Sequence, residues 1–224
     1  MSAKSNGKVV VIPSAHTVAG ERITDGLQAN EYRLALGATP AHFQTLDARI
    51  DGRENAYCQP VDLDRPESVN TFFQIAFSQV GQPDIIALEA LPINGRRLQP
   101  ERTVEIATRR LLHCLDAALP YLGETLHFLF IAPAYGPAAI PIATAFLGAQ
   151  AAANGKTSIP KVRMSVVSPP PAYPCDDAAF ARTIVHLIEE PQYPDVTEAL
   201  LSTKRKSRPR GTRSDVNART RIDA

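Results

Sequence analysis

The stretch Leu126-His-Phe-Leu-Phe-Ile-Ala132 is apolar at every position except one, over a length typical of a β-strand. A strand that faces water on one side alternates apolar and polar residues, whereas here both sides carry aliphatic or aromatic side chains. We therefore expect this strand to lie inside a sheet that is covered on both faces. Sheets of this kind are parallel, and helices connect their strands.

Short aliphatic runs alternate with helix-length amphipathic segments on both sides of this stretch. The runs predict strands at residues 8–12, 31–36, 55–61, 84–88, 126–132 and 161–167. The amphipathic segments predict helices at residues 20–30, 40–50, 66–80, 101–122, 142–154 and 176–189. This order predicts an α/β fold, a doubly wound parallel sheet in a three-layer sandwich with right-handed crossovers.

The chain has 224 residues, the size of a single domain, which we expect to span residues 8–200 after a flexible N-terminus at 1–7. Residues 204–224 carry eight Lys or Arg against two Asp, a net charge of 8 − 2 = +6. The whole chain has a net charge of +1, so the remaining residues carry 1 − 6 = −5. Residues 201–224 therefore predict a disordered basic tail. An acidic body is not typical of a nucleic-acid-binding domain, so nucleic acid would bind only through the tail, which could equally be a solubilising extension.

Three features bear on location. Cys58, Cys114 and Cys175 are far apart and lack the spacing of metal ligands, so we expect reduced thiols and no metal site. The N-terminus lacks the apolar core of a secretory signal, and no apolar run reaches the roughly 18–20 residues that span a bilayer. These features predict a cytoplasmic protein without a membrane partner.

Three motifs occur in the order and spacing of a known family. They are Val61-Asp-Leu-Asp-Arg-Pro-Glu-Ser-Val69 after the third strand, Gly81-Gln-Pro-Asp-Ile-Ile86 before the fourth, and Val162-Arg-Met-Ser-Val-Val-Ser-Pro169 at the sixth. Together they resemble the short-chain dehydrogenase/reductase family over residues 8–190. The resemblance implies a Rossmann-like sandwich, in which Asp62 would meet the adenine ring of a dinucleotide.

The family's glycine-rich turn, T-G-x-x-x-G-x-G, is replaced by Pro13-Ser-Ala-His-Thr-Val-Ala-Gly20. Of its glycines only Gly20 remains, while Ser14 and Val18 stand at the other two positions. Glycines let the backbone approach the pyrophosphate closely, and a β-branched valine adds bulk there. Glu89 falls where the family has an N-N-A-G signature, and its charge would repel phosphate. We expect these to be vestigial cofactor positions, although an anion could still bind the amides near His16 and Thr17.

The family's catalytic residues are also replaced at the expected spacing. Its serine falls at Pro133, its tyrosine at Phe146, its lysine at Gln150, and an assisting asparagine near Glu105. The resemblance thus implies no catalytic residues and no cofactor. Tyr135 could replace the lost tyrosine, but no lysine follows it at the required distance.

His113 and Cys114 could suggest a nucleophile pair. Neighbouring residues point to different sides of a helix, so we expect both to pack in the core or at an interface. His127 alternates with apolar strand residues and is expected to be structural.

The leading hypothesis is a pseudoenzyme, a non-catalytic subunit that works through oligomerisation, as a homo-oligomer or hetero-oligomer with an intact paralogue. The resemblance implies that helices 101–122 and 142–154 make the contacts. One alternative is a divergent NAD(P)-dependent oxidoreductase. Others are a regulatory module that binds a small ligand, and a scaffold that depends on the basic tail.

Overall fold

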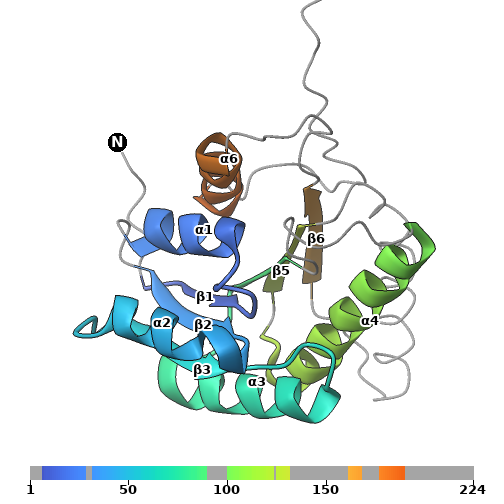
Figure 1. Ribbon diagram of the computed structural model, residues 1–224, viewed down its shortest axis with the longest axis horizontal. Coiled ribbons are helices and arrows are strands. Elements are labelled where there is room, and N and C mark those ends of the chain that lie inside the picture. The colour runs from blue at the N-terminus through green and yellow to red at the C-terminus, as the bar shows by residue number, and fades with distance from the viewer. Residues whose placement is uncertain are drawn as a thin grey trace, which may run out of the picture.

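The computed structural model describes residues 7–28, 32–89, 100–123, 125–131, 161–167 and 177–189. Their strands form one parallel sheet in the order β3-β2-β1-β4-β5-β6 (Figure 1). The strands are β1 (Val9–Ile12), β2 (Arg33–Ala38), β3 (Ala56–Pro60), β4 (Ile85–Glu89), β5 (Thr125–Ile131) and β6 (Lys161–Val167). The doubly wound parallel sheet predicted from the sequence is confirmed.

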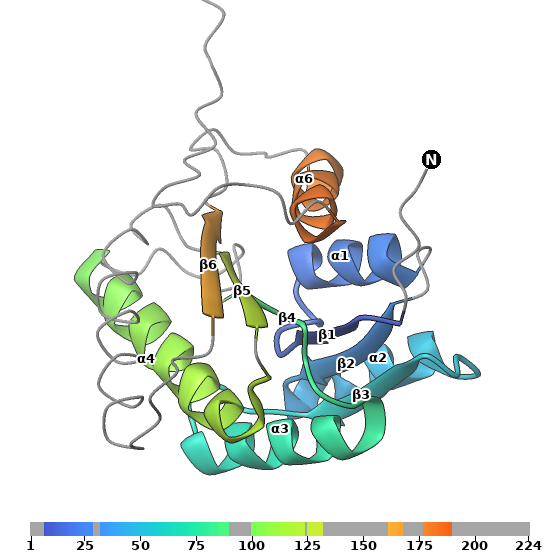
Figure 2. The same cartoon turned by 180° about the vertical axis from the view of Figure 1, so that it is seen from behind.

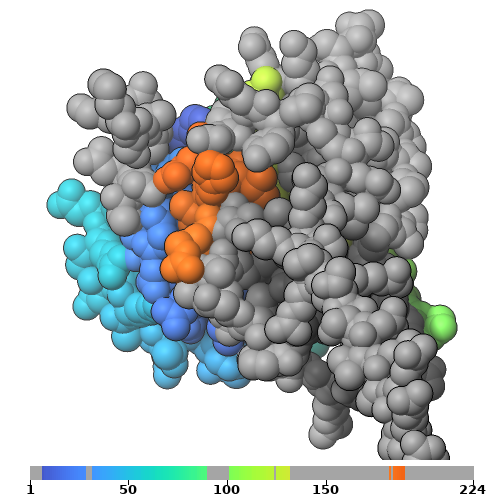
Figure 3. Space-filling model, turned by 90° about the horizontal axis from the view of Figure 1, so that it is seen from above, coloured from blue at the N-terminus to red at the C-terminus, as the bar shows by residue number. Residues whose placement is uncertain are grey.

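Helices cover both faces of the sheet, which makes three layers (Figures 1 and 2). One face carries α1 (Val18–Gln28), α2 (Pro40–Ile50) and α6 (Asp177–Glu189). The other carries α3 (Pro66–Val80) and α4 (Pro100–Ala118). On the first face α6 lies beside α1 (Figure 3), and Gly26 allows this approach, since a Cβ there would lie 2.7 Å from a methyl of Val185.

Strands β1 to β5 each contribute to two separate cores. Val9 and Val11 pack under α3 and α4, whereas Val10 and Ile12 pack under α1 and α2. Strand β5 alternates in the same way, so its apolar sequence has a direct structural reason. The largest fully buried side chains include Phe72, Phe73, Phe128 and Phe130, all on the α3 and α4 side. Burying each such ring contributes about 1.5–3 kcal/mol relative to leaving it exposed.

Asp84 joins three strands at the end of the sheet where they begin. Its carboxylate accepts the Val9 amide at 2.8 Å, and its own amide donates to the Val9 carbonyl at 3.0 Å. Its carbonyl accepts the His127 amide at 2.9 Å. The aspartate of the Gly81–Ile86 motif therefore has a structural role.

Most predicted elements begin and end within two residues of those observed, and two differences have clear causes. Helix α1 begins at Val18, before the expected residue 20, because the Thr17 hydroxyl accepts the Gly20 amide at 3.0 Å and caps the helix. Helix α4 ends at Ala118 instead of residue 122, and a short 3-10 turn, Leu119–Tyr121, follows. Pro120 causes this early end, because its ring would clash with a carbonyl of the preceding turn.

Several predictions fall on residues outside those described: the helix at 142–154, the N-terminal residues 1–6 and the basic tail. Among the helices of the described part, none is both long enough and apolar enough to cross a membrane.

Replacing Asp84 tests its role in joining the strands. Asp84→Ala should lower the free energy of unfolding by about 1–2 kcal/mol, because it removes a hydrogen bond to a charged acceptor at a partly exposed site. Asp84→Asn keeps an oxygen acceptor and should cost less, as measured by urea denaturation. Equal losses for the two variants would contradict this role.

Candidate functional site

The chain reverses its order across the sheet between β1 and β4, and ligands of open parallel sheets bind at the carboxyl ends of such strands. The first segment at this edge is the β1–α1 turn, residues 13–17. Its Ala15 amide donates to the Gly37 carbonyl at 2.8 Å, and the Thr17 amide donates to the Ser14 carbonyl at 3.1 Å. The turn is thus closed by its own backbone and held against the end of β2.

Glu89, the last residue of β4, fastens the same turn from the other side. Its amide donates to the Ser14 hydroxyl at 3.0 Å, and its carboxylate accepts a hydrogen bond from the Thr17 hydroxyl. Ser14, Thr17 and Glu89 are all buried, with 2%, 6% and 3% of their surface exposed. The turn that would hold a pyrophosphate is therefore bonded internally through side chains.

This arrangement sets a carboxylate beside the positive end of α1. A helix N-terminus attracts anions by about 0.3–1 kcal/mol at an exposed site. Glu89 is buried at the N-terminus of α1 and accepts the Thr17 hydroxyl, so the residues of this turn bond to one another where the fold would offer the turn to a pyrophosphate.

Gly20 is the glycine that remains, and the structure shows why. A Cβ at this position would lie 2.3 Å from the Ser14 carbonyl oxygen and 2.8 Å from the Ala15 Cα. Gly20 thus lets α1 pack directly on the turn, whether or not a ligand binds. Val18 begins the helix with a 41% exposed side chain, the one large hydrophobic residue so exposed in the described part.

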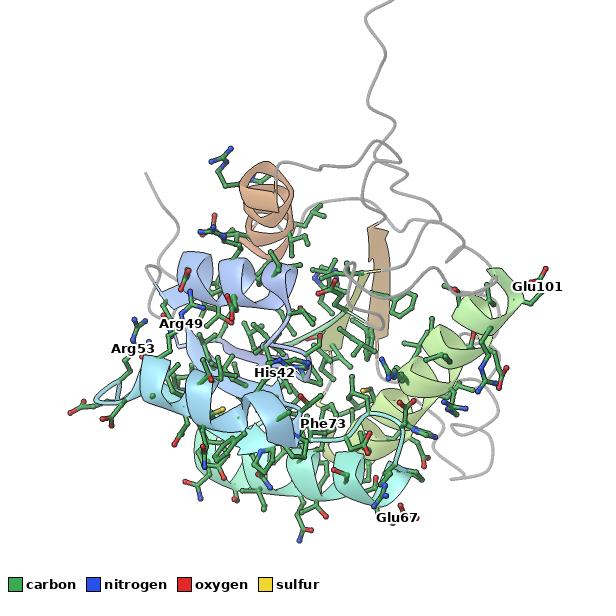
Figure 4. The ribbon with its side chains drawn as sticks, viewed as in Figure 1. His42, Arg49, Arg53, Glu67, Phe73 and Glu101 are labelled. Atoms are coloured by element: carbon green, nitrogen blue, oxygen red, sulfur yellow. The ribbon has the colours of Figure 1, made fainter. Side chains whose placement is uncertain are left out.

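A pair of histidines that sequence reasoning missed lies next to this turn. The rings of His16, in the turn, and His42, in the first turn of α2, stack with centroids 5.1 Å apart. Figure 4 labels His42 on α2. The Thr39 hydroxyl lies 2.8 Å from His42 Nδ1. Burial lowers the pKa of His16, and electrostatic interactions with His42 and Arg110 lower it further. Nothing local in the sequence couples the two histidines, because only the pairing of β1 with β2 brings them together.

The loop after β3 is held by two arginines of α4. Asp64 accepts bidentate hydrogen bonds from Arg110, at 3.0 and 2.6 Å, and a third from Arg109 at 2.9 Å. These hydrogen bonds lower the pKa of the Asp64 carboxyl to about 2. Arg109 also lies 3.8 Å from Glu105, the position expected for the assisting asparagine, and Arg102 pairs with Glu105 at 2.7 Å.

Asp62, expected to meet an adenine ring, is engaged within its own loop. Its carboxylate accepts the Asp64 amide at 3.0 Å, and its amide donates to the Ser68 hydroxyl at 2.9 Å. Its side chain is 43% exposed. Asp62 therefore shapes the loop that carries Asp64.

Of the remaining positions discussed from the sequence, some are described by the structure and others lie outside the described residues. Cys114 is fully buried, and burial raises the pKa of its thiol, while His113 Nδ1 lies 2.9 Å from the Leu63 carbonyl oxygen. Both therefore pack internally, as expected. No group of three or more metal-binding side chains occurs in the described ranges. The structure does not describe four of the positions discussed above, namely Pro133, Tyr135, Phe146 and Gln150.

The chain is similar to known oxidoreductases, weakly in sequence and more extensively in structure. No protein-family model matches the sequence. An uncharacterized oxidoreductase of Staphylococcus saprophyticus is 23% identical over 165 residues, which cover 67% of this chain and 64% of that protein. The chain thus spans slightly less than two thirds of the length of this relative.

Solved structures match over more of their length. An Aeromonas hydrophila oxidoreductase of the short-chain dehydrogenase/reductase family has a TM-score of 0.63 at 16% identity, covering 85% of this chain and 96% of that one. A Brucella melitensis short-chain dehydrogenase/reductase has a TM-score of 0.61 at 18% identity. The match covers 84% of this chain and 92% of that one. A Thermococcus sibiricus alcohol dehydrogenase, complexed with 5-hydroxy-NADP, has a TM-score of 0.58 at 19% sequence identity. The match covers 85% of this chain and 94% of that one. The chain therefore has the short-chain dehydrogenase/reductase fold.

Gly20→Ala tests whether the remaining glycine serves packing. It should lower the free energy of unfolding by about 1–3 kcal/mol, because the new methyl group meets rigid backbone atoms. Gly26→Ala is the matched control on the same helix, since its methyl would meet only the movable side chain of Val185 and should cost less. A Gly20→Ala protein as stable as the parent in thermal denaturation would contradict the packing role.

Asp64→Asn tests the ion pairs of the β3–α3 loop. Because its folded pKa is depressed, Asp64 contributes stability that is present above its ordinary pKa of 3.8 and lost as the pH falls toward 2. The variant should be less stable at pH 7 by about 1 kcal/mol or less, since the side chain is 39% exposed, and should lose part of the pH dependence below 4. Asp116→Asn, at an exposed position of α4, should change neither quantity in denaturant titrations.

Proposed function

We propose that this chain is a non-catalytic subunit with the short-chain dehydrogenase/reductase fold, which acts by assembling with other subunits. The observation that carries the proposal is the buried contact between the Thr17 hydroxyl and the Glu89 carboxylate. It occupies the place where the fold offers a helix N-terminus to a pyrophosphate, so the scaffold is kept while its anion site is closed.

Replacement of the catalytic set supports the same conclusion. By sequence position, Pro133, Phe146 and Gln150 stand where the resemblance expects serine, tyrosine and lysine. A proline, a phenylalanine and a glutamine at these three positions provide no side chain that exchanges a proton with a carbonyl oxygen at neutral pH. Glu105 stands near the fourth position and is paired with Arg102.

The proposed partner is a catalytically intact member of the same fold, or a second copy of this chain. The resemblance implies contacts through α4 and through residues 142–154. The latter segment is rich in small residues, which permit close approach of two helices. A partner with intact glycines and a complete serine, tyrosine and lysine set would supply the chemistry.

The second candidate is a divergent NAD(P)-dependent oxidoreductase. The Staphylococcus saprophyticus relative is named an oxidoreductase, and the Thermococcus sibiricus structure contains an NADP analogue. For this chain to use NAD(P), the cofactor would have to bind without the usual contact between pyrophosphate and α1. Binding by the purified chain therefore separates the two candidates.

The test has two arms. Calorimetric titration of the purified full chain with NADH and NADPH should give no saturable binding up to about 1 mM, which corresponds to a binding free energy weaker than about −4 kcal/mol. Mild purification of the tagged chain from its native host should recover a short-chain dehydrogenase with an intact catalytic set, in fixed proportion. Removing this chain should then change the partner's stability or rate. Micromolar binding of NADH or NADPH by the chain alone, together with turnover of a carbonyl substrate, would overturn the proposal in favour of the second candidate.

A further inference from the structure

The His16–His42 stack connects two segments of the carboxyl edge. His16 is half-buried in the β1–α1 turn, whereas His42 is exposed and lies on the outer side of the ring stack. Their contact holds the turn against the first turn of α2. It lies next to the Ala15 amide, which donates to the Gly37 carbonyl and fixes the turn on β2.

The neutral and protonated forms of His16 fit this position unequally. Its Nδ1 atom is buried and has no hydrogen-bond partner among the residues that the structure describes. A neutral imidazole can leave one nitrogen without a proton, but an imidazolium carries an N–H on both. Protonation would therefore place an N–H on a buried nitrogen that has no acceptor in good hydrogen-bond geometry in the closed turn.

Most of the surroundings of His16 lower its pKa. The His42 ring on α2 and Arg110 on α4 both lower the pKa of His16, as does burial. Hydrogen bonding to the Gly37 backbone and the Glu21 carboxylate on α1 raise it, but burial and His42 have the two largest effects. The closed turn therefore disfavours the charged ring.

We propose that His16 is a pH-sensitive latch: when it is protonated, its ring leaves the stack with His42 and the β1–α1 turn opens away from β2. Above neutral pH the ring stays neutral, the stack holds and the turn is closed. As the pH falls below 6.5, the open turn, in which a solvated His16 has its ordinary pKa, binds the proton more tightly and gains population. The device controls whether the β1–α1 turn stays on β2, and it operates whether the chain is a non-catalytic subunit or an enzyme.

The test follows the wild-type chain by NMR between pH 8 and pH 4.5. The C–H signals of His16 should titrate below 6.5, and the Ala15 and Thr17 amide signals should shift with the same midpoint. After correction for intrinsic exchange, hydrogen-exchange protection of these two amides should fall about tenfold per pH unit between 6.5 and that midpoint. The Val69 amide, which donates to Arg65 at the start of α3, should keep its protection.

Two variants separate a latch from a general acid effect. His42→Gln changes an exposed side chain and should raise the His16 midpoint toward 6.5, because it removes the covering ring and its charge. His186→Gln, at an exposed position of α6, should leave the midpoint unchanged. In His16→Gln the pH dependence of Ala15 and Thr17 protection should disappear.

The proposal is overturned by any of three results. These are a His16 midpoint at or above 6.5, turn protection that does not change with pH in the wild type, and pH-dependent protection that persists in His16→Gln. None of them bears on NAD(P)H binding or on recovery of a partner, so failure of the latch would leave the proposed function intact.

Discussion

A parallel sheet covered by helices on both faces restricts polar chemistry to its two ends. Strands β1 to β5 send alternate side chains into one core or the other, and a charged group without a partner would be costly to bury in either core. Charged and hydroxyl side chains therefore gather where strands begin or end. At the amino end they tie strands together, as Asp84 does, and at the carboxyl end they decide what the edge can bind.

The carboxyl edge is bonded internally. The Ser14 hydroxyl accepts the amide of Glu89, and the Thr17 hydroxyl donates to the Glu89 carboxylate. The Thr17 hydroxyl also accepts the Gly20 amide, so the group that closes the turn also starts α1. Gly20 lets α1 touch the turn, and this packing role requires no bound ligand.

The sequence predicts local features well and long-range contacts poorly. Helices α2 and α3 begin where predicted because a proline marks each start, at Pro40 and Pro66. The early end of α4 could have been foreseen, since Pro120 stands in the sequence and its effect is local. The contact of Thr17 with Glu89 could not, because it joins residues that are distant in the chain and that meet only in a sheet with this strand order. The same holds for the stack of His16 on His42, for which neither residue carries a periodic signal.

The energetics of the edge also bear on the choice between a non-catalytic subunit and a divergent enzyme. A pyrophosphate in the usual pose would have to displace the Glu89 carboxyl group from Thr17. A buried carboxyl group that loses its hydrogen-bond partner is costly, so this displacement opposes cofactor binding. The cap on α1 would survive such a displacement, because the Thr17 hydroxyl accepts the Gly20 amide through a lone pair and the Ser14 carbonyl, 2.9 Å away, can accept its proton. The obstacle to cofactor binding in the usual pose is therefore the buried Glu89 side chain and not the start of α1.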